Sequence, residues 1–400
     1  MVNKINKSIH EKGKYKIALV HDWFLKDSIG GSEKVCKVLD NLLIKKYGIP
    51  DLFSLVENIS NSDQKIFEDR RINTSFIQKL PFGKNNVQKY LPLIPFAVEQ
   101  LNLDEYDIVF SSSHIASKGI LTSPMQLHIS YVHTPIRYAW DQMNTYLKSS
   151  TLAKLGLEIP IRYLMYKLRE WDFISGYRPD YLIANSNFTA KRIKKYWGRN
   201  SEVIHPPVEI ERFTFNKSRE NFYLSVSRLV PNKRVDLLIN AFNKLGLPLF
   251  IVGDGILKKS LVKKAMPNIK FLGNQSDKIV EDLMSRCRGF ICAGIEDFGI
   301  APIEAMASGA PVIAIGKGGF LDSVKCITKT KNNQISTGLL FKNLNAKDII
   351  DTLNWFEDNK AWKKFDSKEM NEFSKRFDKE NFSKKFEHSI NKAIDNFQKS

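Results

Sequence analysis

Two glutamates bracket a turn whose residues suit the binding of a phosphorylated ligand. Glu296 precedes Gly299 and Glu304 follows it, in a segment that predicts a loop, a short helix and a strand. The free N–H groups of Gly299, Ile300 and Ala301 would face an anion, and the helix dipole favours negative charge there. Carboxylates accept strong hydrogen bonds from hydroxyl groups. The segment therefore predicts a site for a phosphorylated, hydroxyl-rich ligand such as a sugar nucleotide.

Further polar groups follow predicted strands in both halves of the chain. Arg228 ends the strand predicted over 223–226 and Lys233 lies in the next loop, so both can reach one anion. Gly253 ends another strand, where a nucleotide base has room to rest. In the N-terminal half, His133 lies between a buried strand and Pro135. Open parallel sheets bind ligands at the carboxyl ends of their strands, so these positions favour a site.

The elements that must position these residues read as two alternating α/β units. Strands separated by helices predict parallel sheets with crossover connections. Proline at 302 suits a first helical turn, and glycine at 309 suits the position after the helix end. A helix is predicted from about Ser32, with that residue as its N-cap. The predicted strands are 15–20, 52–56, 108–110, 129–132, 181–184, 223–226, 249–252, 271–273, 290–292 and 312–315.

Composition bounds the class of protein. The chain has 400 residues, 43% of them hydrophobic and 26% charged, with a formal net charge of +18. This length suits two domains, and the charge favours anionic partners. The four cysteines have no spacing typical of a zinc site or a disulfide framework, which favours a reducing cytoplasm. The sequence contains no run of roughly 18 apolar residues and its first fifteen residues are not a signal peptide, so any membrane contact is expected to be peripheral.

The Glu296–Glu304 spacing resembles the E-x7-E signature of the retaining glycosyltransferases of family 4. Within that family, the chain is most similar to the WbaZ-like mannosyltransferases of O-antigen assembly. The resemblance extends over roughly residues 15–397. The segments that carry it are His21-Asp22-Trp23, Gly30-Gly31, His133–Asp141, Trp171-Asp172 and Ile204-His205-Pro206-Pro207.

The resemblance implies the α/β fold called GT-B, with two Rossmann-like domains facing a central cleft. We expect an N-terminal, acceptor-side domain over 1–205, a linker over 206–220 and a nucleotide-sugar-binding domain over 221–379. The last helix, 380–400, would cross back to the N-terminal domain. Its apolar stripe consists of Phe382, Phe386, Ile390, Ile394 and Phe397.

The resemblance also implies roles for individual residues. His133 and Glu296 are expected to be catalytic, with His133 beside the transferred sugar and Glu296 on its hydroxyls. Glu304 would hold the ribose. The diphosphate would be held by Arg228, Lys233 and main-chain amides. The expected donor-binding residues are Gly30, Gly31, Arg228, Lys233, Gly253, Phe298, Gly299, Ile300, Ala301 and Glu304.

The expected reaction moves a hexose, with retention of configuration, from a nucleotide sugar to a saccharide. By resemblance the donor is GDP-mannose, with a UDP-sugar as the alternative, and the acceptor is a saccharide, free or linked to polyprenyl diphosphate. No D-x-D motif is placed to hold a metal at the diphosphate, so no cofactor and no metal are expected. The enzyme would act in surface polysaccharide biosynthesis, in the cytoplasm, on the inner face of the cell membrane.

Two other classes compete with this interpretation. An NAD-dependent oxidoreductase also has Rossmann domains, but no G-x-G-x-x-G motif follows Val20 or Val252. A noncatalytic protein that binds nucleic acid or an anionic surface fits the charge, but not the four residues Arg228, Lys233, Glu296 and Glu304. We therefore expect no nucleic-acid partner.

The segment between Leu152 and Asp172 mixes apolar, aromatic and basic residues, including Arg162, Lys167 and Arg169. It predicts either an interfacial helix on an anionic membrane or a helix packed on its own domain with a solvated basic face. In the first case, the apolar face around Leu164 and Trp171 would insert. The basic residues Lys191, Arg192, Lys194 and Lys195 would add to the attraction.

Overall fold

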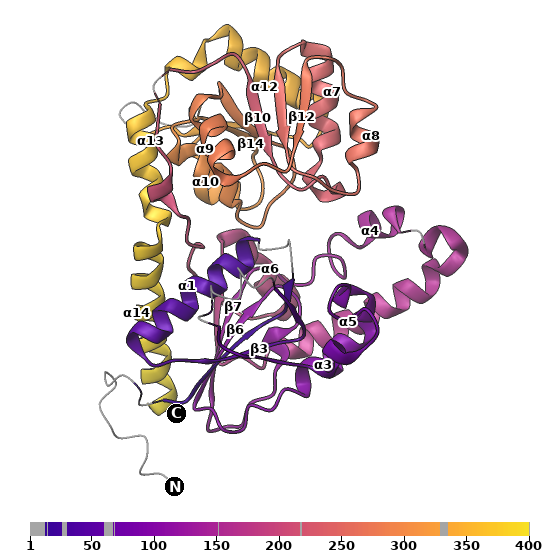
Figure 1. The fold of residues 1–400 in the computed structure, drawn as a ribbon, viewed down its shortest axis with the longest axis vertical. Coiled ribbons are helices and arrows are strands. Elements are labelled where there is room, and N and C mark those ends of the chain that lie inside the picture. Colours follow the sequence, from indigo (N-terminus) through magenta and orange to yellow (C-terminus); the bar gives the residue numbers. More distant parts are fainter. Residues whose placement is uncertain are drawn as a thin grey trace. The chain divides into compact units, whose positions relative to one another are not determined.

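Buried strands separated by helices build two parallel sheets, one in each of two units (Figure 1). Unit 1 comprises residues 1–205 and 382–400, and unit 2 comprises residues 206–381. The computed structural model describes residues 13, 15–25, 30–59, 67, 69–150, 152–216, 218–328 and 335–399. Most of the first fifteen residues, and residues 26–29 of the predicted loop before Gly30, lie outside these ranges.

The main sheet of unit 1 has seven parallel strands. They are β1 (Ile17–His21), β3 (Asp51–Ser54), β5 (Ile72–Thr74), β6 (Ile108–Ser113), β7 (Leu127–Val132), β8 (Tyr181–Ala184) and β9 (Glu202–Val203). Their order is β5-β3-β1-β6-β7-β8-β9, so β3 and β5 lie on one side of β1 and the strands from β6 onward lie on the other. The direction of addition reverses between β1 and β6, and ligands bind at such a switch point in open α/β sheets. Two short strands, β2 (Phe24–Leu25) and β4 (Glu57–Asn58), pair separately.

Helices connect these strands and supply the remaining core of unit 1. They are α1 (Gly31–Lys46), α3 (Ile94–Glu99), α4 (Met143–Ser149), α5 (Glu158–Ser175), α6 (Asn187–Trp197) and most of α14 (Lys379–Lys399). Short 3₁₀ segments are η3 (Phe76–Lys79), η4 (Val87–Leu93) and η5 (Ser117–Gly119), and η6 (Ala153–Leu157) is a π-helix.

The sheet of unit 2 has six parallel strands with the same reversal of direction. They are β10 (Tyr223–Val226), β11 (Leu249–Val252), β12 (Ile269–Gly273), β13 (Gly289–Cys292), β14 (Val312–Ile315) and β15 (Gly338–Phe341). The order β12-β11-β10-β13-β14-β15 is that of a Rossmann sheet, with its switch point between β10 and β13.

The helices of unit 2 pack on both faces of this Rossmann sheet, as in other doubly wound folds. They are α7 (Val235–Leu245), α8 (Lys258–Val262), α9 (Asp277–Arg286), α10 (Ile300–Ala307), α11 (Phe320–Ser323), α12 (Ala346–Asp358) and α13 (Ser367–Ser374). The 3₁₀ segments are η7 (Ile210–Arg212), η8 (Pro231–Lys233), η9 (Ala361–Lys363) and η10 (Lys375–Phe377).

Helix α14 returns the chain to unit 1, as the sequence predicts. Phe382, Phe386, Ile390 and Ile394 are spaced by four residues, which puts them on one face of the helix. All four are buried in the core cluster of unit 1 that includes Val35 and Leu39 of α1. The Tyr47 hydroxyl at the end of α1 donates to Asn391 Oδ1 at 2.8 Å.

Two local predictions are wrong. The N-cap of α1 is Gly30 rather than Ser32, because Glu33 Oε2 accepts hydrogen bonds from the Gly30 N–H and the Ser32 hydroxyl. Residues 206–220 are not a separate linker. Val208, Ile210 and Phe213 are buried in the core of unit 2, so this segment is part of that domain.

None of the helices in the described ranges combines the length and apolar character that crossing a membrane requires.

Candidate functional site

An ion pair lies at the switch point of the unit 2 sheet. Lys233 ends η8 in the connection after β10, and Glu296 lies in the loop after β13. Lys233 Nζ is 2.5 Å from Glu296 Oε1, and about one-fifth of each side chain remains exposed, 21% and 20%. The sequence predicts both residues as donor ligands, and the structure brings them into direct contact. A ligand can therefore bind Lys233 or Glu296 by competing with the other residue of the pair.

Two glycines fix the loops that carry this pair. A Cβ at Gly294 would lie 2.4 Å from the Asn232 oxygen and 2.8 Å from Lys233 Cα, so only glycine allows the two loops to approach so closely. On the other side, the Gly319 N–H donates to the Glu296 carbonyl at 2.9 Å. The backbone around Glu296 is therefore positioned by both neighbouring loops of the sheet edge.

Arg228 and Gly253 lie at the same edge of the unit 2 sheet. The Arg228 side chain is exposed, and it has no ion-pair partner among the residues that the structure describes. Gly253 has a φ of +127°, and a Cβ there would lie 2.1 Å from the Ser227 oxygen. Glycine is therefore required at this position for packing against the Ser227–Arg228 backbone, whatever its role toward a nucleotide base.

The start of α10 has the features of an anion site. Gly299 is the N-cap, with a φ of +91°, and a Cβ there would lie 2.8 Å from the Phe320 ring. No side chain from the described ranges caps this terminus, so the first N–H groups of Ile300 and Ala301 point outward from the helix. The side chain of Phe298 is buried beside Phe377, which leaves only its main chain to contact a ligand.

Glu304 lies near a cation that the sequence interpretation missed. Arg212 Nη2 is 3.9 Å from Glu304 Oε1, and the same guanidinium contacts Asp277 at 2.7 Å and Glu281 at 3.1 Å. Arg212 falls in the segment predicted as a linker, which is why its role was not recognised. The contacts orient it beside the carboxylate that we expect to bind the ribose.

Asp22 organises the corresponding switch point of unit 1. It directly follows β1, and its carboxylate accepts four backbone N–H bonds from the loop after β6. Oδ2 accepts from His114 at 2.6 Å and Ile115 at 2.7 Å, and Oδ1 accepts from Ala116 at 2.8 Å and Ser117 at 2.6 Å. Burial alone would raise the pKa of Asp22, but His114 and these bonds outweigh it and hold that pKa far below its usual value.

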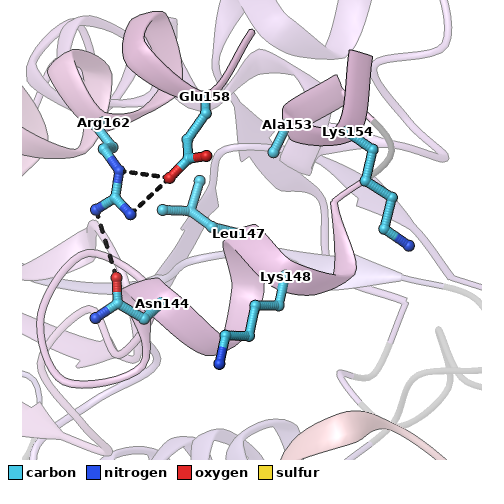
Figure 2. Close-up of a pocket in the computed structure, with 7 residues that line it drawn as sticks. All are labelled: Asn144, Leu147, Lys148, Ala153, Lys154, Glu158 and Arg162. Atoms are coloured by element: carbon cyan, nitrogen blue, oxygen red, sulfur yellow. Dashed lines mark hydrogen bonds and ion pairs between the residues drawn. The ribbon is translucent and has the colours of Figure 1, made fainter. Parts of the chain in front are cut away.

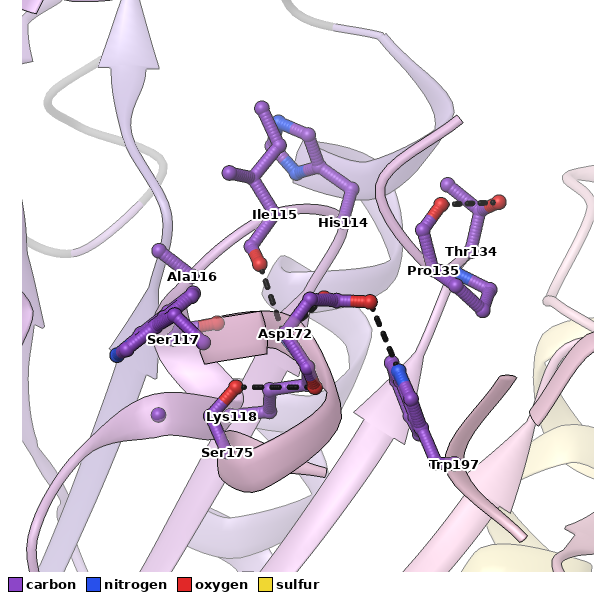
Figure 3. A network of polar contacts seen from close by, with 12 residues as sticks. His114, Ile115, Ala116, Ser117, Lys118, Thr134, Pro135, Asp172, Ser175 and Trp197 are labelled. Carbon is purple, nitrogen blue, oxygen red and sulfur yellow. Dashed lines mark hydrogen bonds and ion pairs between the residues drawn. The ribbon is translucent and has the colours of Figure 1, made fainter. Parts of the chain in front are cut away.

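A buried ion pair holds the same loop from its other side (Figure 3). Lys118 Nζ lies 2.8 Å from Asp172 Oδ1 and donates to the Ile115 carbonyl at 3.1 Å. Asp172 Oδ2 accepts from the indole N–H groups of Trp140 and Trp197 at 2.7 and 2.8 Å. Residues 114–118 are therefore held both by Asp22 and by the Lys118–Asp172 pair.

Three imidazoles gather beside this loop. The ring centroids of His21, His114 and His133 are separated by 5.7 to 6.5 Å. His133 Nε2 is 2.9 Å from Ser112 Oγ, and His21 Nδ1 is 2.9 Å from the Ser112 carbonyl. Burial, followed by the charges of His21 and His114, lowers the pKa of His133 well below its usual value. The predicted catalytic histidine is therefore neutral at pH 7.

The predicted site residues divide between the units. His133, Gly30 and Gly31 belong to unit 1, and the others belong to unit 2. The Gly30 N–H donates to Glu33 Oε2 at 2.9 Å, and Gly31 is the first residue of α1. Asp22 and His21 belong to a segment that carries the family resemblance, but sequence reasoning gave neither a role in the site, although both lie at the end of a buried strand, where ligands usually bind.

The buried histidines give unit 1 a predictable acid sensitivity. Burial, then Arg199 and Arg178, lowers the pKa of His128 to about 3, whereas an unfolded histidine titrates near 6.5. Between these values the unfolded state binds more protons, so stability falls as pH falls below about 6.5. Between pH 7 and 5.5, this histidine should lower the parent's free energy of unfolding by about 1 kcal/mol. His128→Gln should remove that part of the pH dependence.

Urea unfolding of unit 1 at both pH values measures this difference. The control His388→Gln changes an exposed histidine on α14. Its free energy of unfolding should fall between the two pH values as much as that of the parent. An unchanged pH dependence in His128→Gln would show that this imidazole is not buried in its neutral form.

The described residues contain no group of three or more His, Cys, Asp or Glu side chains that is placed to hold a metal ion. Independence from metal remains a prediction.

The comparison with known families concerns unit 2. Residues 208–379 match the family model for glycosyl transferases group 1. The matched residues lie in unit 2. It contains the Lys233–Glu296 pair, the start of α10 and Arg212.

The chain also has relatives among curated proteins. MJ1178 of Methanocaldococcus jannaschii, an uncharacterized glycosyltransferase, is 29% identical over 198 residues, covering 48% of this chain and 51% of that protein. The alpha-1,3/1,6-mannosyltransferase ALG2 of Candida glabrata is 26% identical over 220 residues, 41% of this chain and 48% of the relative. A GDP-mannose-dependent monoacylated alpha-(1-6)-phosphatidylinositol monomannoside mannosyltransferase of Corynebacterium glutamicum is 30% identical over 181 residues, 37% and 48% of the two chains. The chain spans about half the length of these relatives.

Solved structures extend the likeness in fold to both units. HepE of Anabaena, crystallised in complex with UDP, has a TM-score of 0.66 and 16% sequence identity, covering 94% of this chain and all of that one, 100%. Sucrose-phosphate synthase of Thermosynechococcus elongatus has a TM-score of 0.68 and 15% identity over 94% of this chain and 98% of that one. The predicted fold class, GT-B with two Rossmann-like domains, is confirmed. Similarity to the WbaZ-like group stays a prediction.

Proposed function

We propose that the protein is a retaining glycosyltransferase that transfers mannose from GDP-mannose to a saccharide acceptor. The observation that carries the proposal is the Lys233–Glu296 pair at the switch point of the unit 2 sheet. A nucleotide sugar has a diphosphate that attracts the lysine and sugar hydroxyls that attract the carboxylate. Lys233 and Glu296 neutralise each other in the structure. When the donor binds, Lys233 would contact its diphosphate and Glu296 would contact its sugar.

The residues of unit 2 divide the work of binding this donor. Arg228, Lys233 and the amides at the start of α10 would stabilise the diphosphate as it leaves, the preorganised electrostatic effect that dominates many enzymes. Glu304, oriented by Arg212, would accept from the ribose, and Glu296 would accept from the sugar. Front-face attack by the acceptor, with the leaving phosphate taking its proton, would give retention.

His133 is assigned to positioning the transferred sugar. Because burial keeps its imidazole neutral, it would act as a hydrogen-bonding group and not as a cation that balances developing charge. No step of this reaction requires a metal or another cofactor, since Lys233, Arg228 and the helix amides supply the positive charge.

GDP-mannose is favoured as donor by the printed names of the mannosyltransferase relatives. A UDP-sugar is the second candidate, because the HepE structure contains UDP. We propose that the acceptor is linked to a lipid diphosphate and that the enzyme works at the inner face of the cell membrane, in surface polysaccharide or O-antigen assembly.

A panel of sugar nucleotides tests the proposal. The protein is incubated with GDP-mannose, UDP-glucose and UDP-N-acetylglucosamine, and released nucleotide is measured; NAD and RNA are compared in a thermal-shift assay. We expect GDP release from GDP-mannose to be at least tenfold faster than release from the others. Stabilisation by RNA or NAD, with no release from any sugar nucleotide, would contradict the proposed activity. NMR of the product linkage distinguishes retention from inversion.

A further inference from the structure

Helix α5 has apolar side chains on two opposite faces. Met165 and Leu168 are buried on the inner face, and Asp172 on that face binds Lys118. The outer face carries Ile159 and Tyr163, which are 80% and 61% exposed. A helix at a protein surface normally presents polar residues outward, so an apolar outer face indicates a contact that the isolated chain does not make.

The exposed residues form one stripe along the helix. Ile159, Tyr163, Tyr166 and Ile174 are spaced by three, four or eight residues, which puts them on the same side of α5. Leu155 in η6, where the backbone of Leu155 and Gly156 is not helical, is also 72% exposed. The π-helix and the first turns of α5 form an arm that extends from the sheet of unit 1 (Figure 1). The stripe consists of Ile159, Tyr163, Tyr166 and Ile174.

This stripe is not the face that the sequence predicts to insert. Leu164 and Trp171 both pack against the core of unit 1. The Trp171 indole donates to Glu99 Oε1 at 2.9 Å, and Lys118 Nζ lies 4.9 Å from its ring. Arg192 is likewise not a surface cation, because it is buried and paired with Asp141 at 2.5 Å.

Cations flank the stripe at the tip of the arm. A pocket of about 480 Å³ lies between α4 and the start of α5, and Lys148, Lys154 and Arg162 line it (Figure 2). Arg162 is paired with Glu158 at 2.7 Å. Neither Lys148 nor Lys154 has an ion-pair partner within the described part of the chain. Farther along α5, Lys167 is paired with Glu170 at 2.9 Å, so the unpaired cations are those at the tip.

We propose that this stripe and the cations at the tip of the arm are a docking surface for an anionic lipid bilayer. The aliphatic residues would enter the acyl boundary, and the tyrosines would lie at the headgroup level, where their rings are preferred. Lys148 and Lys154 would meet anionic headgroups. A second copy of the chain fits less well, because a symmetric contact would bring the same unpaired lysines toward each other.

This proposal rests on the proposed function, because an enzyme with a lipid-linked acceptor has to reach the bilayer. Its test does not depend on transfer. Binding of the full chain to vesicles is measured by flotation without any substrate, so failure of one proposal leaves the other intact.

The decisive variant is Ile159→Glu combined with Tyr163→Glu. Vesicles contain phosphatidylcholine alone or phosphatidylcholine mixed with phosphatidylglycerol, whose negative surface potential attracts Lys and Arg. The parent should bind the anionic vesicles at least tenfold better. The double variant should lose at least tenfold in binding, and Lys148→Ala or Lys154→Ala should lose about fivefold. The matched control, Ile49→Glu, changes an isoleucine that is 67% exposed away from α5 and should bind as the parent does.

Three outcomes would overturn the proposal. One is unchanged vesicle binding in the Ile159→Glu, Tyr163→Glu variant. Another is loss of binding only when Lys191, Lys194 and Lys195 on α6 are changed to glutamate. The third is a parent that binds no vesicles but forms a dimer in sedimentation, which the double variant converts to a monomer. Circular dichroism and a melting curve establish that each variant is folded.

Discussion

Lys233→Ala is expected to weaken the binding of GDP or UDP by about 2–5 kcal/mol, because it removes one partner of a largely desolvated charge pair. Only 21% of the Lys233 side chain is exposed to solvent, and the backbone of Gly294 packs directly on the main chain of Lys233. Isothermal titration calorimetry with the bare nucleotide measures the loss. Lys244→Ala, on the exposed end of α7, is the control and should bind as the parent does.

The partner variant, Glu296→Gln, should have the opposite effect on nucleotide binding. In the unliganded protein, Glu296 Oε1 lies 2.5 Å from Lys233 Nζ and competes with a phosphate for it. Glu296→Gln removes that competing charge, so affinity for bare nucleotide should stay equal or increase while sugar transfer falls. If both variants lose nucleotide affinity equally, the carboxylate does not bind the sugar and its assigned role is wrong.

The parallel sheets of both units were predictable from local sequence. The strands predicted over 181–184 and 223–226 have the same bounds in the structure as β8 and β10. Short runs of buried residues bounded by polar residues or glycine mark such strands clearly. The positions of Lys233 and Glu296 also follow, because both lie after strands, and parallel strands present their carboxyl ends at one edge.

Contacts between distant segments were not predictable in this way. Asp22 binds residues that are 92 to 95 positions away, and Arg212 lies beside Glu304 across a segment read as a linker. Periodicity gives the faces of a helix but not the neighbour of each face. For α5, both faces are apolar, so the sequence alone could not tell that Leu164 and Trp171 face the core while Ile159 faces solvent.

Asp22→Asn is expected to destabilise unit 1 by about 3–5 kcal/mol, the usual effect of breaking a buried charged contact. The carboxylate accepts four N–H bonds, at 2.6 to 2.8 Å, whereas an amide offers one oxygen and turns an N–H group toward the remaining donors. The loop over 114–117 should therefore loosen. Amide hydrogen exchange at these four residues, together with thermal unfolding, measures both effects.

The pH dependence of the Asp22→Asn effect separates the charge from the shape of the side chain. An aspartate whose pKa is lowered on folding stabilises the protein above its unfolded pKa of about 3.9, and this stabilisation is lost as pH falls below that value. The difference between parent and variant should thus shrink progressively as the pH falls below about 4. Asp107→Asn, an exposed aspartate that accepts one N–H bond from Lys16 at 2.8 Å, should cost less than about 1 kcal/mol. If Asp22→Asn costs no more than this control, or leaves the exchange of residues 114–117 unchanged, the carboxylate does not hold the loop that positions the histidine cluster.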